Sequence, residues 1–230
     1  MIISFSKDFI FFKPIKTAGS SLEEAFWGYC DPIKDICSPD PPRPGYNWKN
    51  EDCLIFNHMN LSQFLATGVL SLYEFKNNFH KITVCRNPWD KQVSSFWHVI
   101  DIQKRYQSLS LAEIEDRYLE DFAQYIRGIC IGDGGKGQAE LSANFFFYQN
   151  GQPFYDSVIR FESLQSNYEM VCNKLSLGTP TTLPKLKTST RLLQYHYSNY
   201  YTEEIKELVG TTYQQAINHF GYNFERQENK

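Results

Sequence analysis

A short segment near the start of the chain combines the residue types that bind phosphate-like anions. In FIFFKPIKTAGSSL, an apolar run that begins at Phe9 is followed by Lys13 and Lys16, and then by a glycine and two serines. A turn that leads into a helix there would aim unpaired N–H groups at an anion, assisted by the helix dipole. Gly19 would let the backbone approach closely, and Lys16 would supply a compact charge. An ordinary strand-to-helix turn is the simpler alternative, and the GxxxxGK[ST] spacing of nucleotide hydrolases is not present.

Further polar residues follow two other expected strands. Arg86 comes after the apolar run Lys81–Cys85, and Ser94 lies eight residues beyond it on the helix expected next. That helix rises ~9 Å before Ser94, so the pair can grip one anion only if the arginine folds along the helix. His58 follows the expected strand Cys53–Phe56, and an ordinary histidine pKa of about 6.5 suits a general base. An ion pair for Arg86 and a structural hydrogen bond for His58 are the alternatives.

The elements that must position these residues alternate along the chain. Apolar runs predict four strands, and the helices expected between and after them have cap residues at their starts. This alternation predicts one α/β domain over residues 1–230, with a parallel sheet and crossover helices. Polar residues at the carboxyl ends of parallel strands meet in one crevice, and Glu162 would join them there. The expected strands are Phe9–Phe12, Cys53–Phe56, Lys81–Cys85 and Ser157–Phe161. The expected helices start at Ser20 or Ser21, near Leu61, at Pro88, after Ser110, at Ser166 and near Thr202, the last running to Phe220.

Three segments outside these elements leave alternatives open. Asp31–Asn50 is rich in proline and predicts a long loop, either a lid beside the site or a surface excursion. Gly132–Gly137 has the composition of a phosphate loop, but no strand leads into it, which favours a flexible connection. Lys185, Lys187 and Arg191 form a basic segment that either closes over a bound nucleotide or is a solvated loop.

The composition excludes several classes of protein. A net charge of -3 argues against a nucleic-acid partner. The six cysteines are scattered without zinc-like spacing, which predicts free thiols and no metal. No apolar run approaches the ~18 residues of a membrane span, and no signal peptide is recognisable at the start. We expect a soluble, cytoplasmic protein without a membrane partner, and the oligomeric state stays open.

Together, these motifs resemble a known family. KPIKTAGSSL resembles the 5'-phosphosulfate loop, commonly PKTAGTSL, of sulfotransferases that use 3'-phosphoadenosine 5'-phosphosulfate (PAPS), especially the carbohydrate sulfotransferase branch. CRNPWDKQVSSF resembles their 3'-phosphate segment, commonly RdPwdRlvSaf, with Asn87 in place of an acid and Lys91 in place of an arginine. FNHMNL resembles the motif that carries a catalytic histidine in some members, and VIRFESL with a later NYYTEE resembles the C-terminal pattern.

The resemblance implies a P-loop-like three-layer fold, with a central parallel sheet flanked by helices, and a role for each matching residue. His58 would take the proton from the acceptor hydroxyl, and Lys16 would neutralise the bridging oxygen as 3'-phosphoadenosine 5'-phosphate (PAP) departs. The acceptor would be a small metabolite or a saccharide, and no metal would be needed. The residues implied in donor binding are Lys16, Thr17, Ala18, Gly19, Ser20, Ser21, Arg86, Ser94, Lys187 and Arg191.

Two other functions remain open from the sequence. A P-loop-type kinase has related architecture; Thr17 follows Lys16 as its Mg²⁺-binding hydroxyl would, but no strand-end Asp is apparent. A non-catalytic nucleotide-binding module is the other alternative, and a plausible base at His58 counts mildly against it.

Overall fold

The fold is described from a computed structural model of the chain. The structure describes residues 1–38, 55, 57–131, 148–149, 152–186 and 191–227. Most of the expected loop Asp31–Asn50 and of the strand Cys53–Phe56, all of Gly132–Gly137, and Lys187 lie outside these residues. The chain divides into two compact units, and each is built from separate segments. Unit 1 comprises Met1–Cys85 and Phe145–Leu186, and unit 2 comprises Arg86–Asn144 and Lys187–Lys230. The single domain over 1–230 stays a prediction.

Unit 1 contains a five-stranded sheet in the order β3-β1-β2-β4-β7. β2 pairs with β4 and β4 pairs with β7 in parallel, whereas β1 is antiparallel to both β2 and β3. The sheet is therefore mostly parallel, as expected for β2, β4 and β7, whereas β1, which was not among the expected strands, runs antiparallel to its two neighbours. Its strands are β1 (Ile2–Ser4), β2 (Phe9–Phe11), β3 (Ile36–Cys37), β4 (His80–Cys85) and β7 (Ser157–Arg160). A separate hairpin pairs β5 (Tyr148–Gln149) with β6 (Gln152–Pro153).

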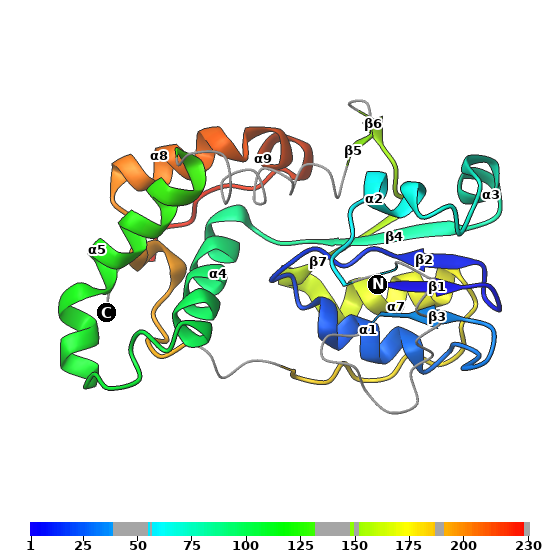
Figure 1. The fold of residues 1–230 in the computed structure, drawn as a ribbon, viewed down its shortest axis with the longest axis horizontal. Helices are drawn as coiled ribbons and strands as arrows, with labels where there is room; N and C mark the ends of the chain where they lie inside the picture. Colours follow the sequence, from blue (N-terminus) through cyan, green and yellow to red (C-terminus); the bar gives the residue numbers. More distant parts are fainter. Residues whose placement is uncertain (39–54, 56, 132–147, 150–151, 187–190, 228–230) are drawn as a thin grey trace. The chain divides into compact units, whose positions relative to one another are not determined.

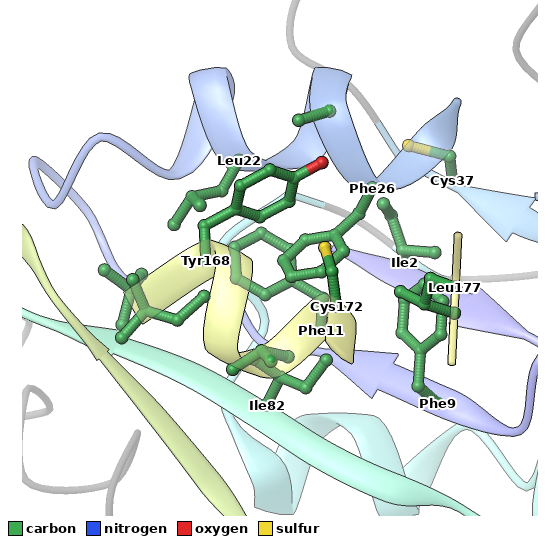
Figure 2. Close-up of a cluster of buried hydrophobic side chains, with 14 residues drawn as sticks. Ile2, Phe9, Phe11, Leu22, Phe26, Cys37, Ile82, Tyr168, Cys172 and Leu177 are labelled. Atoms are coloured by element: carbon green, nitrogen blue, oxygen red, sulfur yellow. The ribbon is translucent and has the colours of Figure 1, made fainter. Parts of the chain in front are cut away.

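Helices cover both faces of this sheet (Figure 1). Because side chains alternate along a strand, Phe9 and Phe11 pack on one face while Ile10 and Phe12 pack on the other. The first face buries its aromatic and aliphatic side chains against α1 and α7, as Figure 2 shows for Phe26 and Tyr168. The unit 1 helices are α1 (Gly19–Trp27), α2 (Leu61–Ala66), α3 (Leu72–Asn77) and α7 (Leu164–Lys174), the last preceded by the short η2 (Phe161–Ser163).

Unit 2, in the part that the structure describes, is helical. α4 (Pro88–Ile102) begins at its expected cap Asn87, and α5 (Leu111–Cys130) begins with the expected capping box of Ser110 and Glu113. Aromatic rings fill its interior, with Phe122 against Phe96 and Tyr200. The other elements are η3 (Tyr197–Tyr200), α8 (Glu203–Thr212) and α9 (Gln214–Phe220).

Two helix boundaries differ from the expectation. The helix predicted to run from Thr202 to Phe220 is broken at Tyr213, whose ψ of 17° leaves the helical region, although Gly221 ends α9 in the left-handed conformation as expected. The first helix has neither serine as its cap. It begins at Gly19 after Ala18, which is left-handed and caps no N–H with its side chain.

Candidate functional site

The expected anion loop in unit 1 has an unusual backbone. Lys16 and Ala18 both adopt left-handed conformations, with φ of 59° and 61°. Residues without a glycine's freedom rarely hold this conformation, and it tends to occur where surrounding structure imposes it, often at ligand sites. The N–H groups of Ser21 and Leu22 bond to the Ala18 carbonyl at 3.1 and 3.3 Å. Within the described residues, the preceding N–H groups of Gly19 and Ser20 donate no hydrogen bond, so the start of α1 keeps donors for an anion.

Lys13 fixes this loop against α1 and is not itself a ligand candidate. Its Nζ lies 2.8 Å from Glu23 Oε2, and both side chains are buried. The lysine stem crosses Gly19 so closely that a Cβ there would lie 2.3 Å from Lys13 Cγ. Glycine is therefore needed at position 19 for packing against this buried ion pair. The amino group of Met1 also contacts Glu23, at 2.6 Å from Oε1.

Two of the expected hydroxyl donors make contacts inside the protein. Thr17 Oγ1 donates to the Pro14 carbonyl at 2.8 Å, and the Ser21 hydroxyl accepts from the Leu186 N–H at 3.3 Å. Both residues are buried, whereas Ser20 is half-buried. Thr17 therefore shapes the turn. Ser21 holds the expected basic segment beside the start of α1, with Lys185 exposed next to Leu186.

His58 is held by the backbone of the same loop. Its Nδ1 lies 2.8 Å from the Lys13 carbonyl oxygen, although the two residues are far apart in sequence. A carbonyl can only accept, so Nδ1 carries the proton and Nε2 keeps its lone pair. No described residue contacts Nε2 through a hydrogen bond. This contact brings His58 to the segment that leads into the expected anion loop.

Burial sets the proton affinity of His58. Desolvation lowers the pKa of His58 to about 4, and the hydrogen bond to the Lys13 carbonyl opposes this only in part. The imidazole is therefore neutral at pH 7, but it is a weaker base than an ordinary histidine. Asn57, immediately before it, has a buried side-chain nitrogen and oxygen that find no hydrogen-bond partner among the described residues. Sequence reasoning missed Asn57, because nothing in its neighbours marks an unpaired amide.

In unit 2, the second cation of the sequence motif is paired with a carboxylate. Arg86 Nε and Nη2 lie 2.8 and 2.7 Å from Asp90 Oδ2, and Arg191 Nη1 lies 3.8 Å from Asp90 Oδ1. Ser94 is half-buried on α4. Asp90 was missed because its partner Arg191 comes from a distant part of the chain. Arg86 and Arg191 are thus brought together, whereas Lys187 lies outside the described residues.

Two features remain, the strand-end candidate Glu162 in unit 1 and a cavity in unit 2. Glu162 lies in η2 and is exposed. A cavity of about 450 Å³ in unit 2 is lined by none of the expected site residues. Its walls are formed by Trp97, Ile100, Asp101, Lys104, Tyr106, Gln107, Leu109, Leu111, Ile114 and Leu192.

Comparisons with known proteins do not extend the assignment. No family model matches this chain, and neither a curated protein nor a solved structure matches it. Among the residues that the structure describes, no helix has the length and apolar character required to cross a membrane. In the same residues, no three His, Cys, Asp or Glu side chains are grouped as a metal ion would require. The family resemblance therefore rests on the sequence motifs alone.

Proposed function

We propose that this chain is a sulfotransferase that moves a sulfuryl group from PAPS to a hydroxyl of a small metabolite or a saccharide. The observation that carries the proposal is the hydrogen bond from His58 to the Lys13 carbonyl, 2.8 Å long. It holds a neutral imidazole, with one nitrogen lone pair available, on the loop whose sequence matches a phosphosulfate-binding motif.

The loop from Lys16 to Ser21 would bind the 5'-phosphosulfate. The N–H groups of Gly19 and Ser20 would donate to it at the positive end of the α1 dipole, and the half-buried Lys16 would add charge. Thr17 would contribute through its backbone, because its hydroxyl already donates to the Pro14 carbonyl. Ser21 would contribute through its hydroxyl hydrogen, because its N–H bonds to the Ala18 carbonyl while its hydroxyl oxygen only accepts from Leu186. The left-handed Ala18 supports this role, since alternating backbone conformations turn successive N–H groups toward one anion.

In the transfer step, His58 Nε2 would take the proton of the acceptor hydroxyl. The acceptor oxygen forms a bond to sulfur while the bond from sulfur to the bridging phosphate oxygen breaks, and PAP departs. Lys16 would neutralise the negative charge that develops on that bridging oxygen. Such transfers need mainly positioning and charge stabilisation from the protein.

The low pKa of His58 fits this step when the donor is bound. A neutral imidazole can accept a proton at any pH well above about 4, so it needs no prior deprotonation at pH 7. Bound phosphosulfate would place negative charge close to the ring and favour its protonated form. The base would therefore strengthen upon donor binding.

Arg86 and Ser94 would bind the 3'-phosphate of the donor. Arg86 and Ser94 match the family's 3'-phosphate segment, and Arg191 shares the carboxylate partner of Arg86. Lys187 remains part of the proposal from the sequence alone.

The His58→Ala variant tests the assignment of the base. The slow conversion of PAPS to PAP that we expect of the chain can be measured by chromatography. We expect its rate to fall at least about 100-fold in the variant, because general base catalysis contributes roughly that much or more. The affinity for PAP should stay within about threefold of wild type, because His58 is assigned no donor contact. A variant with full turnover would rule out His58 as the base. A Lys16→Ala variant should instead lose both rate and affinity, and no change in either would reduce the loop to a simple turn.

A further inference from the structure

One carboxylate in unit 2 contacts two arginines that are far apart in sequence. Asp90 Oδ2 accepts from Nε and Nη2 of Arg86 at 2.8 and 2.7 Å, and Asp90 Oδ1 lies 3.8 Å from Arg191 Nη1. We propose that Asp90 is a positioning residue that holds both guanidinium groups together as one site for a phosphate monoester. This inference rests on the proposed function, because the monoester would be the 3'-phosphate of the donor.

Arg191 is already oriented by other contacts. Its Nε donates to the Leu193 carbonyl at 3.1 Å, its Nη2 donates to the Tyr195 carbonyl, and its guanidinium lies over the Tyr200 ring, 5.3 Å from the centroid. Nη1 is the remaining donor nitrogen. At 3.8 Å from Asp90 it is beyond hydrogen-bonding distance, and within the described residues it donates no hydrogen bond. Nη1 of Arg191 is thus available to an anion.

Asp90 balances the charges that this arrangement brings together. Two guanidinium groups repel each other, and the carboxylate between them offsets that repulsion. The location of Asp90 in the first turn of α4 also favours a negative charge, through the helix dipole. The cluster of Arg86, Asp90 and Arg191 retains a net charge of about +1, so it still attracts an anion.

The exposure and geometry of the cluster indicate which anion fits. The side chains of Arg86, Asp90 and Arg191 are 10%, 19% and 22% exposed, so solvent reaches the group without filling it. One guanidinium group can donate two parallel hydrogen bonds to two oxygens of the same phosphate or carboxylate. A phosphate monoester has three terminal oxygens and close to two negative charges, which two guanidinium groups can share. A ligand with a single charge would gain less from the second arginine.

The test compares two nucleotides that differ only in the 3'-phosphate. Isothermal titration of the full chain measures the affinities for PAP and for adenosine 5'-phosphate, and their ratio reports on the 3'-phosphate alone. For wild type we expect a ratio of about 100 or more, as two charge-assisted contacts would give. For Asp90→Asn, which keeps the shape and removes the charge, the ratio should fall at least about tenfold, while the affinity for adenosine 5'-phosphate should change less than about twofold.

Asp101→Asn is the matched control, because it removes the same charge from an exposed position on the same helix. We expect it to keep the wild-type ratio. An unchanged or higher ratio for Asp90→Asn would overturn the positioning role. If that variant does not fold, Arg191→Gln replaces it: a tenfold loss of the ratio supports the inference, and an unchanged ratio overturns it. Failure of wild type to bind PAP would instead overturn the proposed function, and the inference with it.

Discussion

The two units contain ion pairs that differ in how far their side chains are buried. In unit 1, the Lys13 and Glu23 side chains are 2% and 3% exposed, and their contact closes a buried junction between a strand and a helix. In unit 2, Arg86, Asp90 and Arg191 are several times more exposed, and Nη1 of Arg191 donates no hydrogen bond to any residue that the structure describes. A buried pair cannot exchange its partner without leaving a charge in the interior, whereas a half-buried cluster can accept an incoming anion. Exposure therefore separates the charges that hold the fold from those that could bind a ligand.

The largest effect is expected from breaking the buried pair. Lys13→Met leaves the buried Glu23 with the Met1 amino group as its remaining charged contact and should lower the free energy of unfolding by about 3 kcal/mol. Urea denaturation at pH 7 measures this. Lys34→Met, which alters an exposed lysine of the same unit, should change stability by less than about 0.5 kcal/mol. If the Lys13 variant loses under about 1 kcal/mol, the contrast between the two kinds of pair fails.

The burial of His58 predicts a pH-dependent loss of stability. Its pKa is about 4 when folded and near 6.5 when unfolded, so the unfolded state binds the extra proton between these values. The contribution is fully present above about pH 6.5 and is lost as the pH falls toward 4, at about 1.4 kcal/mol per pH unit.

Comparison of wild type with His58→Gln isolates this contribution. Between pH 7 and pH 4, wild type should lose roughly 3 kcal/mol more unfolding free energy than the variant. His219→Gln removes an exposed imidazole, so its free energy of unfolding should stay within about 0.5 kcal/mol of the wild-type value at both pH values. Parallel curves for wild type and His58→Gln would mean that the ring is solvated.

A smaller effect is expected from adding a methyl group at Gly19, where the Lys13 side chain packs against the start of α1. Gly19→Ala places a Cβ 2.3 Å from Lys13 Cγ, and should cost about 1–3 kcal/mol because a packed, paired side chain must move. Gly128→Ala, in α5 with no atom near the added Cβ, should be neutral or stabilise by up to about 1 kcal/mol. Thermal denaturation measures the stability change of each variant. Equal changes at the two positions would contradict close packing at Gly19.

The smallest effect concerns an ion pair at the surface of unit 2. Arg127 Nη2 lies 3.0 Å from Glu204 Oε2, with the two side chains 41% and 64% exposed. Arg127→Met should shift the urea denaturation curve far less than Lys13→Met does, and the difference from wild type should shrink in 1 M salt. A loss equal to that of Lys13→Met would show that exposure does not rank these pairs.

Local sequence signals predicted the elements whose cause is local. Asn87 and Pro88 gave the start of α4, and Ser110 with Glu113 gave the start of α5, because caps act within one turn. β1 and β3 were missed, since strands of three and two residues exist through their pairing and carry little pattern of their own.

The same distinction between local and long-range causes applies to the candidate site. The loop and His58 followed from motifs that lie within short segments. The commitment of Lys13 to Glu23, the buried amide of Asn57 and the link from Asp90 to Arg191 depend on residues that meet only after folding. The sequence motif assigned the anion role to Lys16, but the buried ion pair of the neighbouring Lys13 with Glu23 could not be read from that motif.

Thermal denaturation with PAP, compared with ATP plus Mg²⁺, tests the central proposal most directly. Binding to the folded state raises the unfolding temperature, and ligand at 100 times its dissociation constant adds about 2.7 kcal/mol. We expect PAP to stabilise the chain by several degrees whether or not Mg²⁺ is present, with a much smaller effect from ATP plus Mg²⁺. Stabilisation by ATP plus Mg²⁺ alone would contradict the sulfotransferase assignment.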